Sequence, residues 1–229
     1  LGLGAMGEVW LARHGALKRP AAIKLIRPEE LAVGGISDTS TRSQRFEREA
    51  RATAALRSKH TVHLYDYGTT DSGQLYYVME YLEGIDLDAL VERYGQVAPE
   101  RAVFLLAQVC HSLMDAHACG MIHRDIKPGN IRVCKLGPDA DFVKVLDFGL
   151  VKYVEAGDRD DDPGLTVEGT TPGTPAYMAP EVALGEPEIG PATDIYMLGC
   201  VAYWLLTGRV VFTGSTPVGH HILRCAAET

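Results

Sequence analysis

The sequence predicts an α+β fold with two lobes, a small antiparallel β-sheet lobe with one helix and a larger, mainly helical lobe. Short runs rich in β-branched and aromatic residues dominate the first part of the chain, whereas apolar residues at helical spacing dominate the rest. The change falls at a hinge near residues 80–84. We therefore expect one domain composed of lobes at residues 1–82 and 83–229, with the second lobe truncated at its C-terminal end.

In the first lobe, three segments have strand composition and are separated by Gly and polar breaks. They are EVWLAR, AAIKLI and LYYVMEYL, at residues 8–13, 21–26 and 75–82. A helix of strong helix formers interrupts them at residues 43–57. Its apolar face is expected to carry Phe46, Ala50, Ala54 and Leu56.

In the second lobe, residues 99–120 predict a helix with Pro99 in its first turn and Gly120 at its end. The strands IRVC and FVKVLDFG follow, at residues 131–134 and within 142–149. The last helix, DIYMLGCVAYWLLTG, ends at Gly208. Because it is apolar all round from Ile195 to Leu206, we expect a fully buried core helix, too short to span a bilayer.

Composition excludes several classes of protein. The formal net charge of −8 disfavours binding to nucleic acid or to an anionic membrane. The five cysteines are scattered, without a CxxC pair, which favours a reducing cytoplasm over a disulfide or zinc framework. The sequence shows no signal peptide and opens on Leu1, so we expect it to begin inside a longer protein.

A glycine-rich motif, GLGAMGEV, occupies Gly2–Val9. Glycines let the backbone approach phosphates and present N–H donors to them. A dinucleotide-binding loop would lead into a helix, but here a strand follows. A Gly-rich hairpin without a ligand is the alternative.

The motif AAIK places Lys24 in an apolar strand, where a buried cation needs an anion. An edge-strand Lys facing water is the alternative. The resemblance of this motif to protein kinases implies a Glu of the following helix as the anion: Glu49 is preferred and Glu47 is second. The two lie nearly on opposite sides of the helix, so only one of them can face Lys24.

The segment HRDIKPGN contains Asp125, Lys127 and Asn130, and DFG follows it at Asp147. Asp125 can orient an attacking hydroxyl and accept its proton. Lys127 can neutralise a moving phosphoryl group, while Asn130 and Asp147 offer the oxygen ligands that Mg²⁺ prefers. Such phosphoryl transfer needs positioning and charge compensation more than covalent chemistry.

The ordered set GxGxxGxV, AIK, HRDxKxxN, DFG and APE (Ala179–Glu181) resembles the catalytic domain of protein kinases, over essentially the whole chain. Lys127 and the segment GTPAYMAPE resemble Ser/Thr kinases. GAMGEVWLA, FEREA and HRDIKPGN resemble the bacterial eukaryotic-like branch of that family. The resemblance implies the bilobal protein-kinase fold, ATP and Mg²⁺ or Mn²⁺ as cofactors, and Ser/Thr-containing proteins as substrates.

The resemblance also assigns roles to residues. The catalytic set is Asp125, Lys127, Lys24 and Glu49, and the metal ligands are Asn130 and Asp147. The ATP-binding set adds Gly2, Leu3, Gly4, Ala5, Met6, Gly7, Val9, Ala22, Met79, Glu80 and Leu82. In this set Val9 and Ala22 sandwich the adenine, Met79 is the gatekeeper, and Glu80 and Leu82 offer backbone hydrogen bonds. His123 and Asp194 are expected to hold the catalytic loop.

Two alternatives remain. A pseudokinase, which binds partners without catalysis, would be favoured by loss of Lys24, Asp125, Asn130 or Asp147, and all four are present. A small-molecule phosphotransferase usually lacks the APE segment and the Thr-containing loop before it.

Regulation is expected at the loop Leu150–Tyr177. A phosphate on Thr166, or on Thr170 or Thr171, would pair with Arg124, whereas Thr174 is given a structural role. The resemblance further implies a cytoplasmic domain and a kinase homodimer for autophosphorylation in trans. Relatives often carry a transmembrane segment after the kinase domain, so anchoring outside this chain stays open. The Arg that usually pairs with Glu181 has no counterpart in the sequence.

Overall fold

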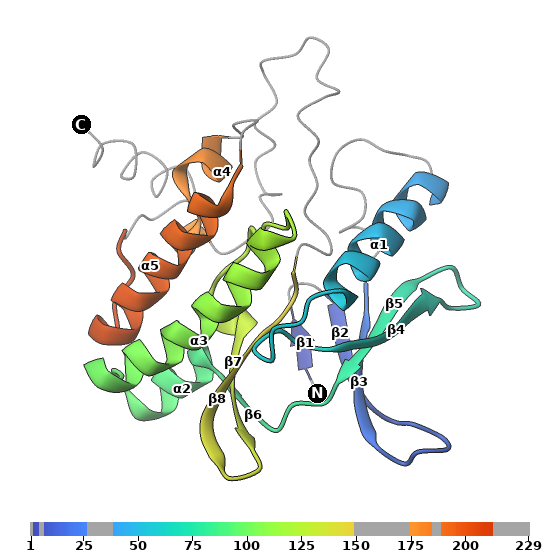
Figure 1. Cartoon of the computed structure of the whole chain (residues 1–229), viewed down its shortest axis with the longest axis horizontal. Coiled ribbons are helices and arrows are strands. Elements are labelled where there is room, and N and C mark those ends of the chain that lie inside the picture. The colour runs from blue at the N-terminus through green and yellow to red at the C-terminus, as the bar shows by residue number, and fades with distance from the viewer. Residues whose placement is uncertain (1, 5–6, 27–38, 149–174, 185–188, 213–229) are drawn as a thin grey trace.

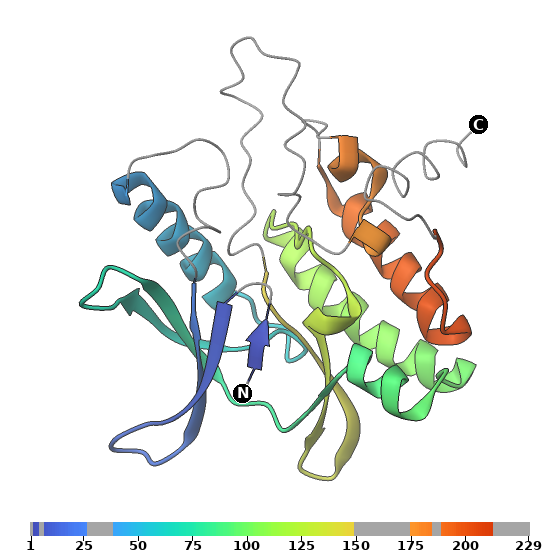
Figure 2. The same cartoon turned by 180° about the vertical axis from the view of Figure 1, so that it is seen from behind.

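The computed structural model describes residues 2–4, 7–26, 39–148, 175–184 and 189–212. The five-stranded sheet with α1 (Thr39–Ala54) lies beside a group of helices and a small three-stranded sheet (Figure 1). The view from behind shows the same two lobes joined by extended chain between β5 (Leu75–Glu80) and β6 (Gly84–Asp86) (Figure 2). The predicted two-lobed α+β architecture is therefore confirmed, while its boundary between residues 82 and 83 stays a prediction.

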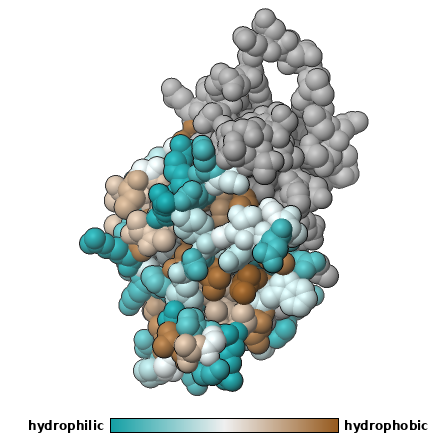
Figure 3. All heavy atoms as spheres, turned by 90° about the vertical axis from the view of Figure 1, so that its right-hand side faces the viewer, coloured by the Kyte–Doolittle hydropathy of each residue, from teal (hydrophilic) through white to brown (hydrophobic). Residues whose placement is uncertain are grey.

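The first lobe contains an antiparallel sheet in the order β1-β2-β3-β5-β4. Its strands are β1 Gly2–Gly4, β2 Gly7–Arg13, β3 Pro20–Leu25, β4 Leu64–Thr69 and β5 Leu75–Glu80. β2, β3 and β5 confirm the three predicted strands, although β5 ends before Tyr81. Alternate residues of β5, namely Leu75, Tyr77 and Met79, are buried in this lobe's core, as expected for a strand with one covered face. Seen from the side of this sheet and α1, exposed apolar side chains form small groups among polar ones (Figure 3).

The helix α1 spans Thr39–Ala54 and lies against β4 and β5 (Figure 1). Phe46 and Ala50 are buried, as expected. The predictions for Ala54 and Leu56 as part of this helix face are wrong: Ala54 is exposed, and Leu56 lies beyond the helix end and packs in the core of the second lobe. Thr53 is buried instead, because a position seven residues after Phe46 returns to the same helix face more closely than one eight residues after it.

The second lobe is mainly helical. Its helices are α2 Leu87–Tyr94, α3 Pro99–Ala118, η2 Pro128–Asn130, η3 Pro175–Tyr177, α4 Pro180–Leu184 and α5 Pro191–Thr207. The small sheet consists of β6 Gly84–Asp86, β7 Ile131–Leu136 and β8 Asp139–Val145. Pro99 begins α3, and Gly208 ends α5 in the left-handed conformation (φ 67°), as predicted.

Within the described residues α5 is buried on one face only, so burial on all sides, as predicted, is not seen there. Met197, Val201 and Leu205 are buried, whereas Ile195, Tyr203 and Leu206 are 53%, 45% and 42% exposed. An apolar composition around the whole helix does not tell which face meets α3. None of the helices in the described ranges combines the length and the apolar character needed to cross a membrane.

Two backbone features lie where the lobes meet. Residues 60–62 run along β8, where Val145 N donates to His60 O at 2.7 Å and Val62 N donates to Val145 O at 2.9 Å. Gly84 opens β6 after the hinge and lies so close to β7 that a Cβ there would be 2.1 Å from the carbonyl oxygen of Val133. The first contact joins the two lobes directly, whereas the second holds the start of the second lobe against β7 just after the hinge.

Candidate active site

One wall of the site is the face of β3 and β5 that carries Lys24. The side chain of Lys24 is 5% exposed, so its charge requires an anion close by. In the antiparallel register Lys24 lies opposite Val9 of β2 and Tyr77 of β5. Residues directly opposite in such a pair project to the same face.

The anion that meets Lys24 is Asp147, directly after β8. Lys24 Nζ is 2.6 Å from Asp147 Oδ2, and Tyr77 Oη donates to Asp147 Oδ1 at 2.5 Å. Asp147 has a left-handed backbone (φ 58°), uncommon for a non-glycine residue and frequent at functional sites. Burial opposes ionisation of this carboxyl, but the Lys24 charge and the two hydrogen bonds outweigh burial, so its pKa lies below the usual value. Asp147 is therefore a carboxylate at neutral pH.

The helix α1 distinguishes the two candidate glutamates. Glu47 accepts hydrogen bonds from Arg51 at 2.5 Å and from Tyr67 Oη at 2.9 Å. Those contacts hold Glu47 on the side of α1 that faces β4, and they engage its carboxylate with residues other than Lys24. Glu49 is partly buried on the other flank of the helix, and its pairing with Lys24 stays a prediction.

The opposite wall is the catalytic loop between α3 and β7. Lys127 Nζ lies 3.0 Å from Asp125 Oδ2. Asn130 Nδ2 donates to Asp125 O at 2.8 Å and to Asp125 Oδ2 at 3.0 Å. With its amide nitrogen engaged in this way, Asn130 keeps its carbonyl oxygen Oδ1 as the acceptor for a cation. All three predicted residues of the loop therefore lie together.

The loop is anchored on Asp194 of α5, which is completely buried. Asp194 Oδ2 accepts from His123 N at 2.9 Å and contacts His117 Nε2 at 2.7 Å. Asp194 Oδ1 accepts from Arg124 N at 2.8 Å. These contacts agree with the holding role expected for Asp194.

His123 links the two motifs of the site. Its Nε2 lies 2.8 Å from Leu146 O, and its Nδ1 accepts from Asp125 N at 3.2 Å. A carbonyl can only accept and a backbone N–H can only donate, so the ring carries its proton on Nε2. The ring also packs against Phe148, with centroids 4.6 Å apart. His123 thus links Leu146, the residue before Asp147, with Asp125. Both of its ring nitrogens are used in these contacts, which agrees with a structural role.

The hinge carries the predicted adenine-side residues. Met79 and Ala22 are buried and lie opposite each other across β3 and β5. Glu80 N donates to His63 O at 3.0 Å. A backbone hydrogen bond from Glu80 to a ligand would therefore use its carbonyl oxygen. The side chain of Glu80 meets Lys144 of β8 at 2.5 Å, which ties the hinge to the second lobe.

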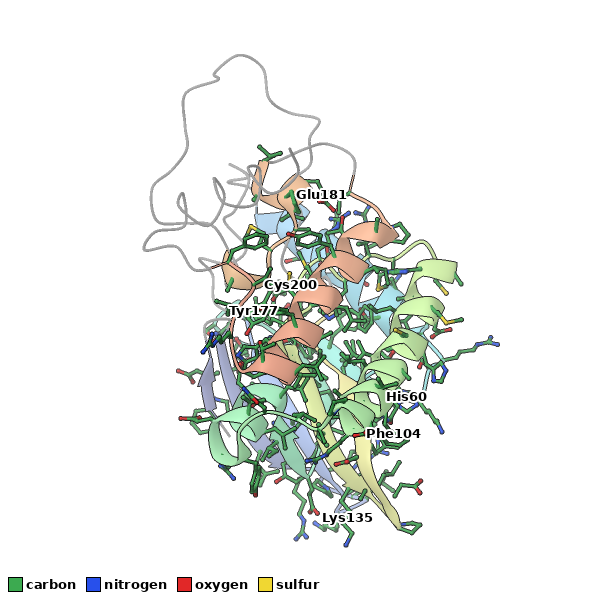
Figure 4. The ribbon with its side chains drawn as sticks, turned by 90° about the vertical axis from the view of Figure 1, so that its left-hand side faces the viewer. His60, Phe104, Lys135, Tyr177, Glu181 and Cys200 are labelled. Atoms are coloured by element: carbon green, nitrogen blue, oxygen red, sulfur yellow. The ribbon has the colours of Figure 1, made fainter. Side chains whose placement is uncertain are left out.

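The APE segment is described from Ala179 to Glu181. Thr193 Oγ1 donates to Glu181 Oε1 at 2.5 Å. Figure 4 shows Glu181 at the α4 end of the lobe, opposite the β7–β8 hairpin tip that carries Lys135. The hydroxyl of Thr193 thus ties the APE carboxylate to the first turn of α5.

Several predicted positions lie outside the described residues: Ala5, Met6, Gly149, Thr166, Thr170, Thr171 and Thr174. For Gly2, Leu3, Gly4 and Gly7 the structure describes the strands β1 and β2 alone. Gly4 and Gly7 pair across this hairpin, which fits a glycine loop that continues as a strand.

Two residues of the site were not predicted from the sequence, Tyr77 and Lys144. The alternation of Leu75, Tyr77 and Met79 indicates that Tyr77 faces inward. Its position opposite Lys24 depends on the strand register, which no local pattern reveals. Lys144 follows the apolar residue Val143 in a strand and carries no comparable signal.

The oxygen donors fit a hard divalent cation shared with nucleotide phosphates. Among the described residues, no cluster of three or more His, Cys, Asp or Glu suits a metal. An ion held by Asp147, Asn130, phosphates and water does not need such a cluster, because Mg²⁺ typically keeps one or two carboxylates and its substrate. The ionised Asp147 and the oriented amide of Asn130 match that ligand set.

Comparison with known proteins agrees with this geometry. The family model described as protein kinase domain matches residues 1–227. The chain is 39% identical over 219 residues to the serine/threonine-protein kinase pkn3 of Myxococcus xanthus, covering 96% of this chain and 38% of pkn3. It is 39% identical to PknB of Mycolicibacterium smegmatis, covering 95% of this chain and 33% of PknB. It is 37% identical to PknH of Mycobacterium bovis, covering 97% of this chain and 35% of PknH.

The chain therefore belongs to the protein kinase domain family. It is similar throughout to bacterial serine/threonine-protein kinases and spans about a third of the length of these curated relatives.

Proposed function

We propose that this protein transfers the γ-phosphoryl group of ATP to Ser or Thr hydroxyls of proteins, with Mg²⁺ or Mn²⁺. The observation that carries the proposal is the 2.6 Å contact between Lys24 and Asp147, which brings β3 of the first lobe onto the segment that follows β8 in the second lobe. Family membership and the names of the relatives support the same activity.

Each residue has a distinct part. Asp125 orients the substrate hydroxyl and accepts its proton. Lys127, already beside Asp125, compensates the charge of the phosphoryl group in transfer. Lys24 holds phosphate oxygens, and Glu49 holds Lys24. Asn130 and Asp147 bind the divalent ion, which when bound neutralises charge on the phosphates.

The nucleotide lies between the glycine hairpin and the hinge in this proposal. The backbone of residues 2–7 covers the phosphates, with Val9 and Ala22 against the adenine. Met79 limits the depth of the site, and the carbonyl of Glu80 and the backbone of Leu82 bind the adenine edge. The burial of Met79 and Ala22 supports these positions.

The test is transfer of radiolabelled γ-phosphate from ATP to a Ser/Thr-containing peptide by the full-length protein, followed by identification of the labelled amino acid. Asp125→Asn, Lys24→Met and Asp147→Asn should each lower the rate by about two orders of magnitude or more. Asp141→Asn, in a partly exposed ion pair with Arg101 of α3, is the control and should leave the rate unchanged. Undiminished transfer by Asp125→Asn would exclude that residue as the base.

The two alternatives give different outcomes in the same assay. A pseudokinase would bind ATP without transferring label. A small-molecule phosphotransferase would label sugars or amino alcohols in preference to the peptide. Label mainly on Tyr would contradict the Ser/Thr assignment.

Regulation by autophosphorylation is part of the proposal, with phosphate on Thr166, Thr170 or Thr171 and Arg124 as its partner. A homodimer would carry out this reaction in trans, in the cytoplasm. The support is the position of Arg124, whose backbone N–H is fixed on Asp194 beside Asp125. Mass spectrometry after incubation with ATP should find the phosphate, and the triple Ala variant of these threonines should be less active.

A further inference from the structure

Tyr77 is nearly completely buried, 1% exposed, in the middle of β5. It lies directly opposite Lys24 on β3 and opposite Tyr67 on β4. Its ring packs against Phe46 of α1 at a centroid distance of 6.4 Å, and Lys24 Nζ is 5.8 Å from the ring centre. The ring is thus enclosed between the sheet and α1.

The hydroxyl of this ring reaches Asp147. Tyr77 Oη donates to Oδ1 at 2.5 Å, while Lys24 Nζ takes Oδ2 at 2.6 Å. Two donors from neighbouring strands therefore hold the two oxygens of one carboxylate. This double contact fixes the rotation of the carboxylate about its Cβ–Cγ bond, which a single contact to Lys24 would leave open.

Each carboxylate oxygen can accept more than one hydrogen bond or metal contact. The contacts from Tyr77 and Lys24 therefore orient Asp147 without using up its oxygens. A rigid ring has few torsions to lose, so a buried tyrosine sets this orientation more sharply than a flexible donor. Outer donors of this kind are known to tune metal ligands, commonly by about 10–100-fold in metal affinity.

We propose that Tyr77 is a positioning residue for the divalent cation, acting by fixing the carboxylate of Asp147 in the orientation that binds the ion. The inference rests on the proposed role of Asp147 as a metal ligand. It adds a residue of β5 to a site whose sequence motifs lie in the glycine loop, β3 and the loops around β7 and β8. It also makes cation affinity depend on the packing of α1, because Phe46 contacts the same ring.

The neighbouring residue Tyr76 supplies a matched control. It lies on the same strand, opposite Leu25 and Gly68, and successive side chains of a strand point to opposite faces. Tyr76→Phe therefore removes the same hydroxyl group from the other face of the sheet, away from Asp147.

The experiment measures Mn²⁺ binding to the full-length protein saturated with a non-hydrolysable ATP analogue, using the electron paramagnetic resonance signal of free Mn²⁺. Tyr77→Phe should weaken Mn²⁺ binding by about tenfold, whereas Tyr76→Phe should bind as the unmodified protein does. The affinity for the analogue without metal should be the same in all three proteins. Urea unfolding shows whether each variant is folded, since Phe retains the buried ring.

Asp147→Asn separates failure of this inference from failure of the proposed site. If Asp147→Asn weakens Mn²⁺ binding and Tyr77→Phe leaves it unchanged or makes it tighter, the role of Tyr77 is wrong and the metal site stands. If Asp147→Asn also leaves Mn²⁺ binding unchanged, the assignment of Asp147 as a ligand is wrong. Equal losses in Tyr76→Phe and Tyr77→Phe would show a general effect on the sheet and overturn the inference.

Discussion

The two walls of the site are assembled in different ways. The catalytic loop places Asp125, Lys127 and Asn130 within one short segment, where contacts run between residues two to five positions apart. The other wall brings Lys24, Tyr77 and Asp147 together from positions 70 and 123 residues apart in sequence. The first wall is thus set mainly by local chain geometry, and the second by strand register and the packing of the lobes.

The local wall nevertheless depends on one distant residue, and its removal should have the largest effect. Asp194→Ala leaves the buried donor His123 N and the partly buried donors Arg124 N and His117 Nε2 without their acceptor. Each stranded buried donor costs about 1–3 kcal/mol, so we expect a loss of about 4 kcal/mol or more in the free energy of unfolding. Urea unfolding of the full-length protein measures the loss, and peptide phosphorylation should be abolished with it.

Asp141→Asn is the control for that variant, because Asp141 pairs with Arg101 at a partly exposed position. It should change the free energy of unfolding by less than about 1 kcal/mol. If Asp194→Ala is no more damaging than Asp141→Asn, the catalytic loop does not depend on α5.

The close packing of β6 on β7, just after the hinge, should be the next most sensitive to substitution. In Gly84→Ala the new Cβ would meet Val133 O at 2.1 Å and Cys134 Cα at 2.8 Å, both of them backbone atoms. We expect a loss of about 2–3 kcal/mol in the free energy of unfolding, typical of overpacking at a site that cannot yield. Because β6 follows the hinge, the rate of peptide phosphorylation should fall as well.

Gly15→Ala is its control, since a Cβ at Gly15 meets nothing within 4 Å. Unfolding midpoints that agree between the two variants would mean that β6 moves away from β7 without cost.

The smallest expected effect is a pH dependence of the free energy of unfolding that comes from His60, at the contact between residues 60–62 and β8. Burial lowers the pKa of His60 below its usual 6.5, against a hydrogen bond to Val143 O that raises it, with the nearby charges of Lys59, His111 and Lys144 adding to the lowering. The unfolded chain therefore binds this proton more readily than the folded one. Above about pH 6.5 the contribution of His60 to the free energy of unfolding is complete. As pH decreases through about 6.5 toward the lower pKa of the folded state, that contribution should be lost and the free energy of unfolding should fall.

His60→Gln should remove this contribution, so that the free energy of unfolding changes less between about pH 7 and pH 5 than in the unmodified protein. A comparison at about pH 8 isolates the packing cost of the substitution, because His60 is neutral there in both states. If the free energy of unfolding changes equally with pH in the His60→Gln variant and the unmodified protein, His60 is not the source of the pH dependence.

The same contrast explains what the sequence could predict. The motifs carrying Lys24, Asp125, Asn130 and Asp147 were found because each is a local pattern of residue types with its own chemistry. Tyr77 was missed because only the pairing of β3 with β5 makes it a neighbour of Lys24. The preference for Glu49 over Glu47 came from the resemblance, and helix geometry added only that the two cannot both face Lys24. The contacts of Glu47 with Arg51 and Tyr67 are consistent with that preference.

Burial was predicted less well than motif position. Ala54 was placed on the buried face of α1 from its apolar character, but helical spacing favours the polar residue Thr53. Full burial of α5 was inferred from composition, which does not state which neighbours are present. The short strands β1 and β6 and the helix α2 went unpredicted. The side chain of Asp86 caps α2 by accepting from Ala89 N at 2.8 Å, a signal visible in the sequence at the start of DLDAL.

The burial of Asp194 also has a consequence for the order in which this protein becomes functional during synthesis. The catalytic loop leaves the ribosome about 70 residues before Asp194 does, as the separation of Arg124 and Asp194 shows. Until α5 has been made and docked, the backbone donors of that loop have only water as their acceptor. A nascent chain can therefore complete its first sheet, and even carry Asp125 into the open, while lacking the anchor that shapes the loop. The catalytic loop thus gains its anchor only after Asp194 has been synthesised and α5 has docked.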